Sequence, residues 1–133
     1  MDAKIRESLT KYNDLFTKRA FAQLATLMPD GSPQVSPVWV DFDGEYILVN
    51  TAQGRQKDRN LKHDPRVAIA IQDPNNAYRK VLVRGRVEQI TTQGADEHID
   101  KLSERYTGNK IYQNRRAGEV REILKIKPEH VTG

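Results

Sequence analysis

The sequence predicts a mainly β domain with helices (α+β), in which six short strands form a small closed barrel with short flanking helices. Six apolar or alternating runs are separated by Gly, Pro and Asn turn signals, which is typical of short strands. Few segments show helical periodicity, and this combination favours a barrel. The 133 residues, 37% of them hydrophobic, fit one domain over residues 1–133 with one modest core. We expect a second copy of the chain to complete part of the apolar surface.

The first half of the chain predicts one helix followed by a meander of three strands. Residues 4–18 carry apolar side chains close to helical spacing, so we expect an amphipathic helix that packs across the barrel. The strands are predicted over residues 20–28, 33–41 and 45–50. The Pro-Asp-Gly-Ser run at residues 29–32 and the Asp-Gly pair at residues 43–44 are the turns that join them.

The second half of the chain predicts three more strands and one helix. The strands are expected over residues 66–72, 78–90 and 119–127, and the helix over residues 93–106. Gly85 lies inside the longest strand and predicts a bulge or sharp bend, which closing a barrel requires. In the last strand apolar residues alternate with Arg121 and two lysines, so Arg121 is predicted on a solvated face.

A short basic helix is predicted between the strands that end near residue 50 and begin at residue 66. Asp64 precedes Pro65, which disfavours helical geometry, so the helix should end by about His63. Its first turns carry Arg55, Lys57 and Arg59, where the helix macrodipole is already positive. Cations are unfavourable there unless an anion shares the site, so this pattern predicts a phosphate site. A solvated basic helix face is the alternative, which the charges alone leave open.

A second candidate segment spans residues 34–39, with the sequence Gln-Val-Ser-Pro-Val-Trp. Pro37 cannot donate a hydrogen bond to a strand ladder, so this strand must lie at an edge or carry a bulge. Ser36 and the free backbone groups beside Pro37 are then placed to face a ligand. Trp39 offers a large flat surface, although a single Trp in a small domain is more often part of the core.

The pattern R-x-K-x-x-N-L-x-x-D-P-R-V over residues 55–67 resembles the signature of flavin- and deazaflavin-dependent oxidoreductases with a split β-barrel. That superfamily includes the FMN-binding, pyridoxamine 5'-phosphate oxidase-like (PNPOx-like) flavoproteins. The similarity extends from about residue 20 to the C-terminus. It is strongest to the small branch that uses the deazaflavin coenzyme F420.

The resemblance implies a six-stranded split β-barrel, a homodimer with cofactor sites at the subunit interface, and three groups of cofactor-binding residues. The strand beside the cofactor ring would contribute Gln34, Ser36, Pro37, Val38 and Trp39. The phosphate and tail would be held by Thr51, Arg55, Lys57 and Asn60. Tyr78 and Arg79 would approach the cofactor of the partner subunit, the alternative being a solvated hairpin tip. Tyr106 and Tyr112 flank a polar segment and are candidates for covering the substrate side.

The resemblance also implies an oxidoreductase activity, with a hydride passing from reduced F420 to a conjugated organic acceptor. The strands at residues 38–40 and 46–49 carry no Arg or Lys, unlike the FMN-type phosphate pattern, so F420 is favoured over FMN. Paired catalytic carboxylates, a nucleophile with a base, and a P-loop are all lacking, so a cofactor would carry the chemistry. The alternatives are an FMN-dependent oxidoreductase or a non-catalytic flavin- or deazaflavin-binding protein.

Composition limits the remaining classes. The chain has no Cys, and its three His residues are far apart, so no metal site is expected. The net charge of +4 favours anionic partners without choosing among them. Binding of nucleic acid ranks last, because the aromatic content is only 7% and no strand interleaves aromatic residues with cations. No apolar run approaches a membrane span, and the N-terminus resembles no signal peptide, so the expected location is the cytoplasm.

Overall fold

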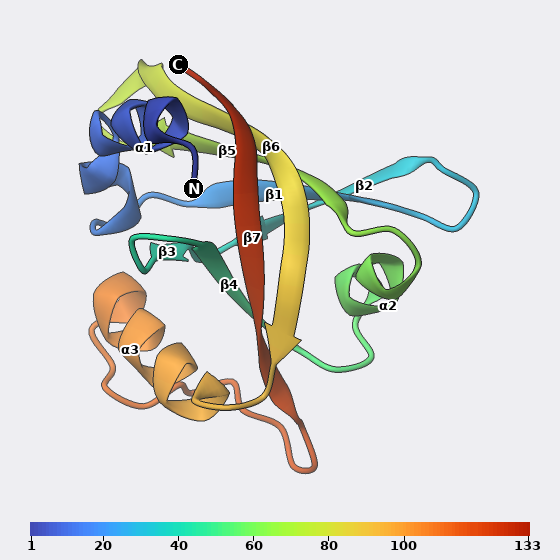
Figure 1. The fold of residues 1–133 in the computed structure, drawn as a ribbon. Helices are drawn as coiled ribbons and strands as arrows, with labels where there is room; N and C mark the ends of the chain where they lie inside the picture. Colours follow the sequence, from blue (N-terminus) through green and yellow to red (C-terminus); the bar gives the residue numbers. More distant parts are fainter.

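Seven strands form one continuous antiparallel sheet in the computed structural model, which describes residues 1–133 (Figure 1). Along the sheet the strands follow the order β2-β1-β5-β6-β7-β4-β3. In chain order the elements are α1 (Ala3–Thr10), the 3-10 helix η1 (Asn13–Phe16), β1 (Ala22–Leu27), β2 (Pro33–Val38), β3 (Asp41–Phe42), β4 (Ile47–Ala52), α2 (Gln56–His63), β5 (Arg66–Asp73), β6 (Asn76–Thr91), α3 (Ala95–Thr107) and β7 (Arg121–Thr132). The mainly β fold with flanking helices is therefore confirmed.

The sheet curls into a barrel but is not closed by hydrogen bonds, because β2 and β3 are its two edges. Pro33 and Pro37 lie in β2, and neither residue can donate to a further strand, as the sequence predicted for an edge. The barrel is therefore split, which confirms the split barrel implied by the resemblance and corrects the closed barrel expected from the pattern of short strands. An 18-residue apolar cluster that includes Leu24, Val49 and Leu124 fills its interior.

The seventh strand arises because the predicted strand at residues 33–41 is divided. Its two parts, β2 and β3, lie at opposite edges of the sheet. The backbone of Val40, between them, bonds to α3 in place of a strand. Its N–H donates to Tyr106 Oη at 3.2 Å, and its carbonyl accepts from Arg105 Nη1 at 3.0 Å. These two bonds satisfy the backbone where the chain crosses from one edge to the other.

The predicted helix at residues 4–18 is also divided, into α1 and η1. Asp2 caps the start of α1, since its Oδ1 accepts from the backbone N–H groups of Lys4 and Ile5. Just after α1, the carbonyl of Lys11 accepts a hydrogen bond from Arg79 Nη2 at 3.0 Å and so does not extend the helix. The apolar residues of this segment still enter the core, as predicted, with Leu9 and Phe16 only 1% exposed.

The two long strands β6 and β7 pair in antiparallel fashion, and their backbones come unusually close at Gly85. The ladder between them shifts register at Gly85, where an added Cβ would collide with the backbone carbonyl of Lys127. The bulge predicted at Gly85 is therefore confirmed. Strand β7 runs five residues past the predicted end at residue 127, because Pro128 falls at this irregularity, where a missing N–H is tolerated.

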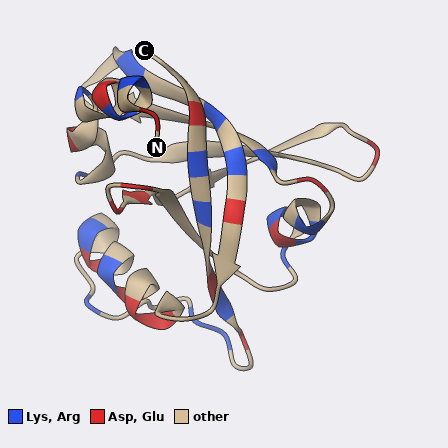
Figure 2. Ribbon diagram, viewed as in Figure 1, with Lys and Arg blue, Asp and Glu red and all other residues tan.

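The helices lie at separate places around the curled sheet (Figure 1). Helix α1 lies near the C-terminal end of β7, α3 packs against β4 and β7, and α2 contacts β1. Acidic and basic side chains both occur on α2, α3, β6 and β7, so the positive net charge is spread over several elements (Figure 2). None of the helices combines the length and apolar character needed to cross a membrane.

Candidate functional site

A cavity of about 290 Å³ lies where the end of β2, the start of α2, helix α3 and the segment before β7 meet. Its walls combine apolar, aromatic and cationic side chains. The lining residues are Phe21, Pro37, Val38, Trp39, Asn50, Arg55, Lys57, Ile99, Leu102, Tyr112, Asn114 and Arg121. Concave sites that are largely apolar with a few polar groups are typical of small-molecule binding.

Three cations contribute to this cavity. Burial lowers the pKa of Lys57, and the positive charges of Arg55 and Arg121 lower that pKa further. Arg55 is the N-cap residue of α2, so the positive end of that helix adds to the same region. A bound anion would relieve the mutual repulsion of these charges. The arrangement therefore fits a phosphate or another anionic group.

Arg121 is buried, which corrects its prediction as a solvated residue. Its Nε donates to Asn50 Oδ1 at 2.9 Å, its Nη1 to Glu119 at 3.2 Å, and its guanidinium lies 5.2 Å from the centre of the Tyr112 ring. The predicted alternation holds from Leu124 to Lys127, but it is wrong at the start of β7, where four consecutive residues are buried and Tyr112 lies against Arg121. No local signal in the sequence shows that contact.

An aromatic cluster forms another wall. Trp39 stacks on Tyr106 with ring centres 5.3 Å apart and an angle of 5°, and Tyr112 meets Trp39 edge-on at 6.0 Å. Phe21 packs on Tyr106 at 5.4 Å and is 56% exposed. Trp39 thus takes both roles considered from the sequence, since it packs against α3 and also lines the cavity. Tyr106 is buried, whereas Tyr112 reaches the cavity.

A hydrogen-bonded chain fixes α3 beside the cavity. His98 Nε2 lies 3.2 Å from Asp41 Oδ2, and the other ring nitrogen lies 3.2 Å from the side-chain nitrogen of Asn50. Burial alone raises the pKa of Asp41, but hydrogen bonds from His98 and Arg105 outweigh burial and hold that pKa well below its usual range. The side chain of Asn50 therefore connects this group of hydrogen-bonded residues to Arg121. None of these positions was singled out from the sequence.

Five of the predicted cofactor residues line the cavity, namely Pro37, Val38, Trp39, Arg55 and Lys57. Two more, Ser36 and Thr51, lie on the flanking strands β2 and β4, and each has a buried hydroxyl oxygen with no hydrogen-bond partner. A ligand or water that reached these oxygens would supply the missing bonds.

The other four predicted residues lie outside the cavity. Gln34 accepts a hydrogen bond from Thr26, and the amide of Asn60 is fully buried and donates to Thr26 Oγ1 at 3.0 Å. Tyr78 is 92% exposed on the hairpin between β5 and β6. Arg79 forms ion pairs within the chain, at 2.8 Å to Asp14 and 3.0 Å to Asp73 (partners that the sequence did not indicate). A contact of Tyr78 or Arg79 with a partner subunit's cofactor stays a prediction.

A pair of buried carboxyl groups lies between α2 and β7. Asp58 is fully buried, accepts a hydrogen bond from the Gly54 N–H at 2.8 Å and pairs with Lys62 at 3.2 Å. Burial, followed by the hydrogen bond and negative charge of Asp58, raises the pKa of Glu122 to about 7. Glu122 therefore holds a proton below about pH 7, whereas the pKa of Asp58 is lowered and this carboxyl group stays ionised.

The chain matches the family model described as pyridoxamine 5'-phosphate oxidase over residues 8–133. Among solved structures it is similar to an F420 reductase, with 34% identity, a TM-score of 0.80, and coverage of 90% of this chain and 94% of that chain. A conserved hypothetical protein from Mycobacterium tuberculosis shares 26% identity with a TM-score of 0.66, over 98% of this chain and 82% of that chain. The general stress protein 26 from Bacillus anthracis, at 16% identity, shares the fold, with a TM-score of 0.66 over 96% of this chain and 91% of that one.

The family match covers nearly all of the chain, and the relative at 34% identity extends over nine-tenths of it. The split barrel, its flanking helices and the motif at residues 55–67 agree with both findings. The chain therefore belongs to the pyridoxamine 5'-phosphate oxidase family of split β-barrel proteins.

Proposed function

We propose that this protein is an oxidoreductase that binds reduced coenzyme F420 in the cavity beside α3 and reduces a conjugated organic acceptor. The observation that carries the proposal is the meeting of three cations and an aromatic wall in one cavity. The similarity to an F420 reductase at 34% identity supports the choice of cofactor.

The residues present fit such a cofactor. Arg55, Lys57 and Arg121 line the cavity and would bind its phosphate, whereas Thr51, with its unpaired buried hydroxyl, lies on β4 outside the lining. Trp39 and the edge of β2 would orient the planar ring. When bound, the deazaflavin supplies the hydride, while the apolar residues of α3 exclude water from the ring.

In this proposal, water supplies the proton that the acceptor takes up along with the hydride. The cavity is lined by no carboxyl group and no histidine, so neither of these two common proton donors faces the acceptor. The same observation favours a second candidate function, a protein that binds a flavin or deazaflavin without turnover. Reoxidation of bound reduced F420 by added quinones or tetrapyrroles distinguishes the two, because a carrier would leave the cofactor reduced.

The test of the cofactor is a pair of titrations of the cofactor-free protein, one with F420 and one with FMN. Trp39 is the only Trp of the chain and lines the cavity, so its fluorescence should report occupancy directly. We expect tight binding of F420 and weak binding of FMN. The reverse order would identify an FMN-dependent protein, and binding of neither would remove the basis of the proposed activity.

We also propose that the protein acts as a homodimer through the outer face of the sheet. Ala25, Ala68 and Ala70 leave a shallow hollow of about 450 Å³ there, and the nearby Val35 and Leu82 are 59% and 40% exposed. Such an apolar surface is favoured as a protein interface. Sedimentation equilibrium should give twice the chain mass of 15.2 kDa, and a monomer at micromolar concentration would contradict the dimer.

A further inference from the structure

The segment that leads into β7 places one carboxylate against the cations of the cavity. The side chain of Glu119 is only 5% exposed, and its Oε1 accepts hydrogen bonds from both Arg55 Nη2 and Arg121 Nη1, each at 3.2 Å. The backbone holds this position, because the Gln53 N–H donates to the Val120 carbonyl at 2.9 Å. Two of the three cavity cations are therefore already paired with an anion of the same chain.

The pairing of Glu119 is incomplete. Its second carboxylate oxygen, Oε2, is buried and has no hydrogen-bond partner. A buried carboxylate oxygen without a donor costs free energy, so this arrangement is poorly stabilised compared with a fully paired ion. A ligand that offered several acceptors to the same guanidinium groups would satisfy them better than Glu119 does.

The two arginines differ in their freedom to move. Arg121 is buried and is also held by Asn50 at 2.9 Å. The side chain of Arg55 is 42% exposed, and Glu119 is the only side chain with which it forms an ion pair. Arg55 can therefore exchange Glu119 for another anion without breaking other contacts, whereas Arg121 keeps its place.

We infer that Glu119 is an internal competitor for the anionic group of the ligand, which must displace this carboxylate from Arg55 in order to bind. The inference rests on the proposed function, because it concerns the same cavity. It adds a selection by charge. Arg55, Lys57 and Arg121 against Glu119 leave two positive charges, so the cavity should favour ligand ends that carry two negative charges over those that carry one.

The opposite role for Glu119 is to hold the arginines in a geometry that the ligand needs. The two roles predict opposite changes in anion affinity for the variant Glu119→Gln. This substitution keeps the shape of the side chain and removes its charge. A competitor that loses its charge yields tighter binding of the anion. A positioning residue that loses its charge yields weaker binding, because Arg55 and Arg121 are no longer fixed.

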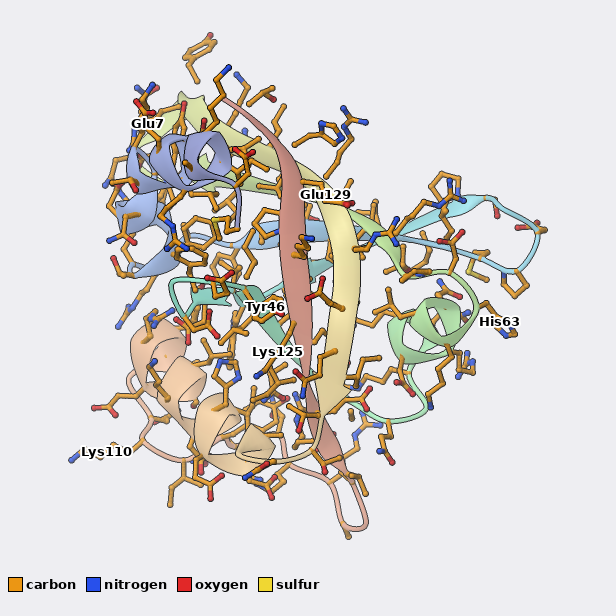
Figure 3. The ribbon with its side chains drawn as sticks, in the orientation of Figure 1. Glu7, Tyr46, His63, Lys110, Lys125 and Glu129 are labelled. Carbon is orange, nitrogen blue, oxygen red and sulfur yellow. The ribbon has the colours of Figure 1, made fainter.

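The experiment measures the binding of inorganic pyrophosphate by the fluorescence of Trp39 in the cofactor-free protein. We expect Glu119→Gln to bind pyrophosphate roughly tenfold more tightly than the wild type, since a competing charge is removed. Glu129→Gln is the matched control, because Glu129 lies on β7 away from α2 and pairs with Arg86 at 3.5 Å (Figure 3). Its affinity should equal that of the wild type.

A double-mutant cycle locates the effect. If Glu119 acts through Arg55, the gain from Glu119→Gln should vanish in the Arg55→Gln background. Equal or weaker binding by folded Glu119→Gln, a gain that survives Arg55→Gln, or no pyrophosphate binding by any variant would overturn the inference. Failure of F420 to bind, with these pyrophosphate results as expected, would remove the proposed cofactor and leave the role of Glu119 standing.

Discussion

Lys57→Ala is expected to weaken the binding of F420 by about ten- to a hundredfold, which corresponds to one charge-assisted hydrogen bond of about 1.5–3 kcal/mol. Lys57 is half-buried in the cavity, and burial together with Arg55 and Arg121 already lowers its pKa. Its positive charge is therefore costly in the empty site and is compensated only when an anion binds. The measurement is the F420 titration followed by fluorescence.

The stability of the fold provides a check on this prediction. Removing a cation that is repelled by two neighbours should leave the melting temperature unchanged or slightly raised. Lys110→Ala is the matched control, because Lys110 extends into solvent away from the barrel (Figure 3). Unchanged F420 affinity in Lys57→Ala would remove Lys57 from the phosphate site, and an equal loss in Lys110→Ala would show a general charge effect.

Local signals in the sequence predicted the part of the cavity that comes from contiguous segments. Cations are unfavourable at a helix N-terminus, and proline is unfavourable inside a sheet. These two exceptions identified Arg55, Lys57 and Pro37 as candidate site residues. Arg121 comes from the other end of the chain and was not predicted in the site. It reaches the cavity through the pairing of β4 with β7, which no local pattern encodes.

The strands were predicted for the same reason, since each is a local run bounded by turn residues. The errors occur where tertiary contacts replace local ones. The break between β2 and β3 depends on Tyr106 and Arg105, more than sixty residues away in the sequence. Asn60 was assigned to the site for the same reason. A polar residue on a basic helix resembles a ligand-binding residue in the sequence, but its side chain is buried and bonded to Thr26.

The wild-type protein is expected to lose about 2–3 kcal/mol of its free energy of unfolding between pH 4.5 and about pH 7 through one residue, Glu122. Burial and the neighbouring Asp58 raise the pKa of Glu122 from 4.5 to about 7 in the folded state. The folded chain therefore holds a proton that the unfolded chain has released. The resulting stability is fully present below pH 4.5 and is lost as the pH rises through 7.

The other shifted carboxyl groups act in a different window. The pKa values of Asp41 and Asp58 are lowered from 3.8 in the folded state. Their contributions to stability are present above pH 3.8 and are lost only on further acidification. They therefore cannot produce a decrease in stability between pH 5 and pH 8. A decrease that depends on Glu122 is thus distinguishable from their effect by its direction.

Glu122→Gln isolates this contribution, because the amide has nearly the shape of the protonated carboxyl group and cannot ionise. Urea unfolding at pH 5 and pH 8 should show that the variant loses less stability than the wild type, so that Glu122→Gln is the more stable of the two at pH 8. Glu88→Gln, at an exposed position on β6, should follow the wild type at both pH values. If Glu122→Gln lost as much stability as the wild type, Glu122 would not be the source of the loss and would already be ionised in the folded protein at pH 5. Asp58 and Glu122 would then both be charged, and α2, which presents Arg55 and Lys57, would pack on a repulsive contact.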